Sequence, residues 1–266
     1  LLNDYYTTEF NQLVFSQLRH QLMQKLNNLL EKLRQKANTF KERLAQSERA
    51  DEYRYYADLL MAYLHEWAPG MDKITLADFE TGKPVTIPLE PDKNAVINAQ
   101  LLYKQHQKLK RARGAVEPLL TDVEAEIEYL EQVEAAVSQI ESYSTAEDLE
   151  TLEEIRDELV SQKYLEDTGY RSRSNDKSKD INFRRFQTPG GLEVLIGRNN
   201  RQNDQLTFRF ANDYDLWFHT QEIPGSHVLL RLQAGNMPDE VDLQHTANLA
   251  AYYSRARQSE QVPVVY

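Results

Sequence analysis

FNQLVFSQLRHQLMQKLNNLLEKLRQKANTFKERL, residues Phe10–Leu44, contains neither glycine nor proline. Its apolar residues recur at spacings of three and four, which predicts a long amphipathic helix with one narrow apolar stripe. A second stripe of this kind runs from Ala99 to Ile140, where Gly114 and Pro118 predict a kink or a local loosening. A narrow stripe needs a partner, so we expect the two segments to pair as a long antiparallel coiled-coil hairpin. Homodimerisation through either stripe is the alternative.

Residues 50–98, between the two stripes, change character and predict a small folded tip. Ala50–Trp67 has helical periodicity, and Ile74–Leu76 and Val85–Ile87 read as short strands around the turn at residues 80–83. Five aromatic residues of this segment either form a contact surface or belong to the core of the tip. They are Tyr53, Tyr55, Tyr56, Tyr63 and Trp67.

The polar stretch Glu166–Asp180 has no periodicity and is typical of a linker. A helix is expected before it, over Ala146–Tyr164, with Ser144 or Thr145 as its N-cap. We predict five segments: residues 1–49, first coiled-coil helix; 50–98, middle (tip) domain; 99–165, second coiled-coil helix and the following helix; 166–181, linker; 182–266, a compact domain expected to be C-terminally incomplete.

The last segment predicts strands around helices, which favours an α+β fold. The predicted fold class is therefore α+β: a long antiparallel coiled-coil hairpin with a small α/β tip, followed by a compact α+β domain. The expected elements are strands at Phe183–Gln187, Leu192–Ile196, Leu216–Thr220, His227–Leu232 and Val262–Tyr266, and helices at Asn199–Ala211 and Asp239–Gln258.

The charge of the chain is unevenly distributed. The net charge is -11, of which residues 1–170 carry −12 and residues 171–266 carry +1. The total therefore hides a basic flank beyond Tyr170 that suits RNA. There is no cysteine, which excludes thiolate metal sites and disulfides, and no apolar run approaches the length of a membrane span. Leu1 is preceded by no initiator methionine, so we expect a piece of a longer protein.

The richest motif runs from Asp215 to Arg231, where two strands bring His219 and His227 to one end of a sheet. Three chemical interpretations remain open: zinc binding by the two imidazoles, general-base catalysis by His219 with Asp215 orienting it, and an RNA site. In the RNA site, the loop N–H groups, both histidines, Ser226 and Arg231 contact RNA, and Trp217 or Phe218 offers a stacking face. A purely structural loop is the fourth alternative.

Two further polar clusters are candidates for phosphate contacts. In the first, Arg198 and Arg201 add positive charge at a strand-to-helix turn whose free N–H groups favour phosphate. The remaining polar residues of this turn are Asn199, Asn200 and Asn203. The alternative is that Asn203 or Asp204 merely caps the helix. The second cluster is Arg255 and Arg257 near a helix end, and its alternative interpretation is that the two arginines complement the helix dipole.

These motifs resemble a known family. The runs at residues 215–228, 197–207 and 250–257 are similar to the RNA-binding (R) domain of the NFACT family. Residues 1–6 resemble the junction that follows the family's N-terminal regions, and residues 87–91 (Ile-Pro-Leu-Glu-Pro) resemble its tip motif. The family includes ribosome quality-control factors and the proteins called fibronectin-binding protein A-like.

The resemblance implies a cytoplasmic, non-catalytic factor that binds large ribosomal subunits, through rRNA and ribosomal protein, when these carry obstructed peptidyl-tRNA. It also implies that the full-length protein recruits tRNA for C-terminal alanine tailing of stalled chains, with no cofactor and no membrane partner. The family's N-terminal domain is missing here, so this chain alone should not support tailing. A fibronectin-binding, adhesin-like surface protein is the alternative function. The oligomeric state stays open.

Overall fold

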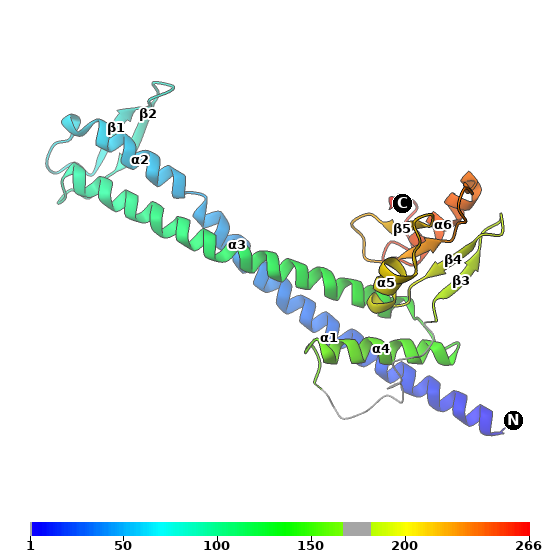
Figure 1. The fold of residues 1–266 in the computed structure, drawn as a ribbon. Helices are drawn as coiled ribbons and strands as arrows, with labels where there is room; N and C mark the ends of the chain where they lie inside the picture. Colours follow the sequence, from blue (N-terminus) through cyan, green and yellow to red (C-terminus); the bar gives the residue numbers. More distant parts are fainter. Residues whose placement is uncertain (1, 167–181) are drawn as a thin grey trace. The chain divides into compact units, whose positions relative to one another are not determined.

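The computed structural model describes residues 2–166 and 182–266, with side chains from residue 9 onward (Figure 1). The chain forms two compact units. One is continuous, Lys32–Glu126, and the other combines Leu1–Glu31 with Ile127–Tyr266. The predicted linker, apart from Glu166, lies outside the described residues.

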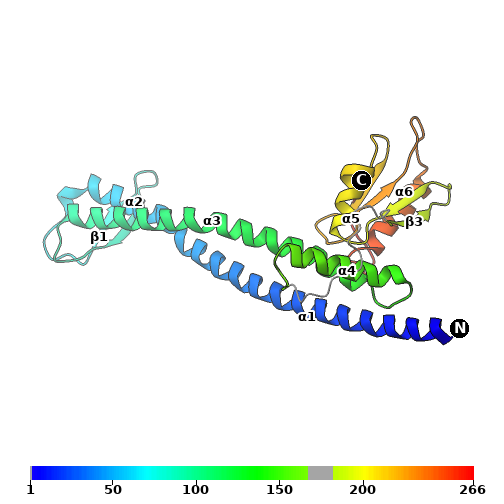
Figure 2. The ribbon, with the colours of Figure 1, turned by 60° about the horizontal axis from the view of Figure 1, so that its bottom comes forward.

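The predicted helical hairpin is confirmed. Helices α1 (Leu2–Ser47) and α3 (Ala95–Gln139) lie side by side in both views (Figures 1 and 2). The pairing uses the apolar stripe of α1, whose buried members include Phe15, Leu22, Leu26, Leu30, Ala37 and Phe40. In the interrupted unit Arg19 Nε donates to the Ile140 carbonyl at 2.8 Å. In the continuous unit Lys41 pairs with Glu124 at 2.8 Å. The apolar stripes of α1 and α3 therefore pair within one chain, as the hairpin prediction required.

Two details of the stripes differ from the prediction or refine it. Phe10 and Leu13 are exposed, so among the α1 side chains that are described, from residue 9 onward, Phe15 is the first buried one. Helix α3 continues through Pro118, yet no residue between His106 and Val123 is buried. The loosening expected near Gly114 and Pro118 therefore takes the form of open side-chain packing along an unbroken helix.

The continuous unit contains the predicted tip. Helix α2 (Ala50–Ala62) and the short 3-10 helix η1 (Leu64–Glu66) replace the single helix expected to Trp67. Strands β1 (Lys73–Ala77) and β2 (Pro84–Pro88) pair antiparallel. Tyr55, Tyr56, Tyr63 and Trp67 pack, partly buried, against the core around Leu59 and Ile87, so these aromatics belong largely to the core.

The other unit carries helix α4 (Ala146–Ser161), which Thr145 caps as expected, and a five-stranded antiparallel sheet. The strand order is β3-β4-β6-β5-β7. The strands are β3 (Arg184–Gln187), β4 (Glu193–Ile196), β5 (Leu216–Thr220), β6 (Val228–Leu230) and β7 (Val264–Val265). The predicted fold class is confirmed.

Alternation along the strands gives the sheet two apolar faces. Val194, Ile196 and Phe218 face helix α6 (Glu240–Tyr252), which supplies Ala250 to this core. Leu195 and Leu229 pack on the other side with Leu206, the first residue of η2. On that side lie α5 (Asn200–Gln205) and the π-helix η2 (Leu206–Phe210), which together replace the single helix expected over Asn199–Ala211.

Helix α6 ends at Tyr252, so the prediction that it continues to Gln258 is wrong. The physical reason is a competing set of backbone contacts. Ser226 N donates to the Tyr253 carbonyl and Arg255 N donates to the Pro224 carbonyl, both at 2.8 Å. Gly225 lies against Ser254 in a β-bridge, and a Cβ at Gly225 would collide with the Ser254 side chain. These contacts draw the chain out of the helix.

Candidate nucleic-acid interface

Three aromatic rings meet beside the η2 side of the sheet, as the sequence predicted for the two histidines. Trp217 and His219 are two residues apart on β5, so their side chains lie on the same face of the sheet. Their rings stack, with centroids 5.6 Å apart. His227, just before β6, lies edge-on to both, 5.0 Å from Trp217 and 5.3 Å from His219. All three rings are half-buried, so each keeps a part that solvent reaches. We call these three residues the Trp–His face.

Thr207, in the π-helix, organises this face. Its hydroxyl accepts from Trp217 Nε1 at 3.1 Å and donates to the Asn203 carbonyl at 3.0 Å. It also lies 2.8 Å from His227 Nδ1. With the hydroxyl proton directed at Asn203, His227 must donate from Nδ1, which leaves Nε2 of the neutral ring as an acceptor. Thr207 ends the family-like run at residues 197–207, but its role could not be predicted from the sequence because a π-helix gives no simple periodic signal.

Both histidines of the face favour the neutral form. Burial lowers the pKa of His219, and a hydrogen bond with the Gly225 backbone opposes this effect. Burial, helped by the neighbouring His219, lowers the pKa of His227 to about 4. At neutral pH the face is therefore an uncharged surface of rings and hydrogen-bonding atoms, suited to stacking rather than to attracting phosphate.

Asp215 and Arg231 lie apart from this chemistry. The two Asp215 oxygens accept from the backbone N–H groups of Leu232 and Asn212, each at 2.9 Å. Arg231 approaches the Asp215 carboxylate at 3.5 Å and donates to the Phe210 carbonyl at 2.9 Å. The carboxylate is thus occupied in holding a loop, and the hypothesis that it orients His219 as a general base is wrong.

The phosphate-site hypothesis needs free polar groups at the turn of residues 197–204, but several of these groups are bonded within the protein. Asn199, not Asn203 or Asp204, is the N-cap, because its side chain accepts from Gln202 N at 2.9 Å. Asn203 is buried, and its side-chain oxygen accepts from His227 N at 3.0 Å. Gly197 is required beside it, since a Cβ there would collide with Asn203. The Asn200 amide nitrogen is buried without a partner among the described residues.

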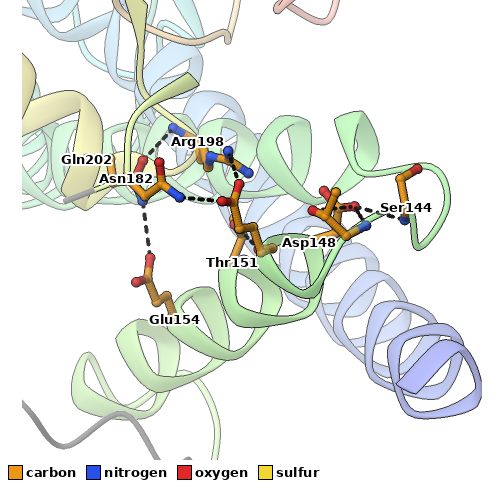
Figure 3. A network of polar contacts seen from close by, with 9 residues as sticks. Ser144, Asp148, Thr151, Glu154, Asn182, Arg198 and Gln202 are labelled. Atoms are coloured by element: carbon orange, nitrogen blue, oxygen red, sulfur yellow. Dashed lines mark hydrogen bonds and ion pairs between the residues drawn. The ribbon is translucent and has the colours of Figure 1, made fainter. Parts of the chain in front are cut away.

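Two carboxylates of α4 occupy this turn (Figure 3). Glu147 accepts from Arg198 at 2.5 Å, and the Arg198 side chain is only 11% exposed. Glu154 accepts from the Asn199 amide at 2.8 Å and more weakly from Gln202 at 3.4 Å. Of the two predicted phosphate-binding arginines, only Arg201 remains exposed. Sequence reasoning missed Glu147 and Glu154 because they lie some fifty residues before the turn.

The cluster after α6 is also engaged by the coiled coil. Arg255 bonds to the Glu134 carboxylate and lies 3.6 Å from that of Glu131, both on α3. Arg257 donates to Glu141 at 3.0 Å and stacks over the Tyr252 ring at 4.2 Å. These arginines lie beyond the end of α6, and they bind carboxylates rather than complement the dipole of that helix.

Neither a metal site nor a membrane span emerges from the described part of the chain. Within residues 2–166 and 182–266, no three histidine or acidic side chains are grouped so as to hold an ion, which leaves the zinc interpretation without further ligands. No helix in those same two ranges has the length and apolar character needed to cross a bilayer.

A paired-helix arm with a folded tip, followed by an α+β domain with a neutral aromatic–histidine face, defines the class of this protein. Family models give the class a name. Residues 1–179 match the NFACT N-terminal and middle domains, and residues 182–266 match the NFACT protein RNA binding domain. The chain belongs to the NFACT family, and the resemblance found in the sequence is confirmed.

Relatives and a solved structure agree with this assignment. The chain is 36% identical over 225 residues to the Rqc2 homolog RqcH of Bacillus subtilis, covering 84% of this chain and 38% of that protein. It is 33% identical to the Streptococcus pneumoniae (serotype 2) protein of the same name, covering 99% of this chain and 46% of the relative. The chain therefore spans less than half the length of these curated relatives.

The solved structure is that of the C-terminal part of the fibronectin/fibrinogen-binding protein from Streptococcus suis. It matches with a TM-score of 0.67 and 30% identity, covering 94% of this chain and 82% of the other. At this identity and coverage the two chains share their fold.

Proposed function

We propose that this chain is the ribosome- and tRNA-binding part of a cytoplasmic ribosome quality-control factor. It binds the large ribosomal subunit carrying obstructed peptidyl-tRNA. In the full-length protein it helps to recruit tRNA for C-terminal alanine tailing of the stalled chain. It acts as a binding module that needs no cofactor, and the chemistry of tailing belongs to the ribosome and to parts outside this chain. Homology to RqcH supports this role.

The Trp–His face is the observation that carries the proposal. It lies in the domain that matches an RNA-binding family model, and its rings are uncharged and partly exposed. RNA-binding domains of comparable size stack unpaired bases on such rings and read ribose 2′-hydroxyls through hydrogen bonds. In this proposal Trp217 and His219 stack a base, the Nε2 acceptor of His227 receives a hydroxyl, and exposed Arg201 contacts phosphate.

The other predicted RNA-binding residues take positioning roles in the proposal. Arg198, Asn199, Asn200 and Asn203 shape the turn behind the face. Ser226, which is buried, holds the loop before His227 through its backbone. Asp215 and Arg231 secure the start of β5. These seven residues support the Trp–His face without forming part of it.

Co-sedimentation with purified large subunits tests the proposal. The chain should pellet with subunits that carry peptidyl-tRNA, less with empty subunits, and less at high salt, because phosphate contacts weaken as salt rises. The variant His219→Ala should pellet less than the variant Gln221→Ala, which alters an exposed residue just beyond the same strand. Absence of pelleting at low salt, with every subunit preparation, would contradict the proposal.

A second candidate function, an adhesin-like protein that binds fibronectin, is favoured by the name of the solved Streptococcus suis relative. It predicts saturable binding of this chain to immobilised fibronectin that RNA does not compete away. If fibronectin retains the chain while large subunits do not, this second function replaces the first.

A further inference from the structure

A polar cavity of about 420 Å³ opens beside β3, away from the Trp–His face. The ends of α3 and α6, the start of α4 and strand β3 supply its walls. Arg184 and Phe186 line it from alternate positions of β3. Arg198 and Tyr253 line the cavity as well. A cavity of this size accommodates a ligand as large as a nucleotide.

Arg184 has no hydrogen-bonded partner in this cavity. Among the side chains described, residues 9–166 and 182–266, no carboxylate or carbonyl oxygen accepts a hydrogen bond from its guanidinium, and its Nη1 atom is buried with no partner. The Tyr253 ring lies 4.8 Å from the guanidinium, and the Asp148 carboxylate acts on it without a hydrogen bond. Buried donors without acceptors are rare in proteins, and a missing ion or ligand is one of their ordinary explanations.

Arg198 adds a second unmet donor in the same cavity. One of its terminal nitrogens is bound to Glu147, but its Nε is buried without an acceptor among the described residues. Burial lowers the pKa of Arg184, and the charge of Arg198 lowers it further, so the two guanidinium groups repel each other. An anion between them would satisfy both donors and remove the repulsion.

The carboxylates of the cavity are already occupied, so they do not fill this role. Glu147 holds Arg198, and Glu141 holds Arg257. Asp148 accepts from the backbone N–H groups of Ser144 and Thr145, at 2.9 and 2.8 Å, at the start of α4. What remains unsatisfied in the lining is cationic, and it is presented by arginine, whose planar fork fits the oxygens of phosphate.

We infer that this cavity binds a phosphate group through Arg184 and Arg198. Phe186 and Tyr253 flank the arginines and offer a ring to an attached base, which favours a phosphate of an RNA chain over an isolated ion. The inference that the phosphate belongs to RNA rests on the proposed function. The inference that the cavity binds a phosphate group is independent of that function.

Two probes, inorganic phosphate and a labelled single-stranded oligoribonucleotide, test the inference on the 266-residue chain. The decisive variant is Arg184→Met. The matched control is Arg185→Met, because Arg185 is the next residue of β3, is exposed and pairs with Glu193. Calorimetry measures phosphate binding, and fluorescence anisotropy at several salt concentrations measures RNA binding.

Arg184→Met should weaken phosphate binding by about tenfold or more, as expected for the loss of a charge-assisted contact. It should also reduce the slope of log affinity for RNA against log salt by about 0.7, the value for one phosphate contact. Arg185→Met should bind phosphate as the wild type does. If Arg184→Met weakens binding of both inorganic phosphate and the oligoribonucleotide, the ligand is an RNA phosphate. If it weakens binding of inorganic phosphate alone, the ligand is a small phosphate compound in the same cavity.

A readout without substitution keeps the test valid if Arg184→Met unfolds. Added phosphate should shift the NMR signals of the Arg184 and Arg198 Nε–H groups, and it should leave that of Arg185 in place. Equal phosphate binding by wild type and Arg184→Met, equal losses in both variants, or no shift of the Arg184 signal would overturn the inference. Failure of the subunit co-sedimentation alone would remove the ribosomal role and leave the cavity intact.

Discussion

The 197–204 turn and the Trp–His face belong to the same α+β domain and are both rich in polar groups, yet they satisfy those groups differently. The turn fills most of its hydrogen bonds within the protein, through Glu147, Glu154 and the backbone, and of its buried side-chain atoms it leaves only Arg198 Nε and the Asn200 amide nitrogen without partners among the described residues. The face keeps its rings half-exposed and uncharged. A cluster of arginine and asparagine in a sequence therefore does not reveal whether its partner is a ligand or another helix of the same chain.

The largest expected effect concerns the uncharged state of the Trp–His face, and it is the dependence of the free energy of unfolding on pH. The pKa of His227 is about 4 in the folded chain, against 6.5 for an ordinary histidine. Between these values the unfolded chain binds a proton that the folded chain does not, so stability falls as pH drops from 6.5 toward 4. The loss attributable to His227 should reach about 3 kcal/mol. Urea unfolding of wild type and His227→Gln across this range measures it, and parallel curves would contradict it.

Asn203 links the two regions, so removing its amide should damage both. Asn203→Ala leaves the His227 N–H without its acceptor, and we expect a loss of about 2 kcal/mol in the free energy of unfolding. Chemical denaturation measures this loss. The control Asp204→Ala, at an exposed neighbouring position, should stay within about 0.5 kcal/mol of wild type. Similar losses in the two variants would show that the Asn203 contact is unimportant.

Glu147→Gln tests whether the turn serves structure. The substitution removes the charged partner of the nearly buried Arg198, and it should lower stability by about 1 kcal/mol because Glu147 itself is partly exposed. Affinity for RNA should not fall, because the substitution leaves Arg198 and its charge in place. Denaturation and anisotropy measure the two quantities. The control is Asp157→Asn on the same helix, whose carboxylate pairs with the adjacent Arg156. A marked gain in RNA affinity for Glu147→Gln would mean that α4 masks a binding site.

His219→Ala should have an effect no larger than that of Glu147→Gln, but on RNA affinity rather than on stability. Losing one stacking ring should weaken oligoribonucleotide binding by about fivefold, or about 1 kcal/mol, with a smaller change in stability. Anisotropy compared with Gln221→Ala measures it. Unaltered affinity would mean that RNA contacts another part of the domain.

The fold could be predicted largely from local pattern. The stripes of α1 and α3 follow from helical spacing, and the strands on either side of Pro189–Gly191 follow from turn chemistry. The end of α6 at Tyr252 could not, because it depends on the contact of Gly225 with Ser254, far along the chain. At the candidate site, the proximity of His219 and His227 was predictable from two adjacent strands.

The partners of the arginines were not predictable from the sequence. Nothing near Arg198 in sequence indicates that Glu147 lies against it, and nothing near Arg255 indicates Glu134. The same holds for the capture of Asp215 by two backbone N–H groups. Each of these contacts depends on tertiary structure, which brings distant residues together after the local elements have formed.

The division into a continuous unit and an interrupted one has a consequence for the order of folding. Lys32–Glu126 is an uninterrupted stretch of chain with its own core, so it can complete itself as soon as it has been synthesised. Leu1–Glu31 must wait for residues beyond Ile127, and its contact of Arg19 with Ile140 closes a long loop. The part of α1 before Lys32, though synthesised before the continuous unit, is therefore expected to reach its final partners after that unit has folded.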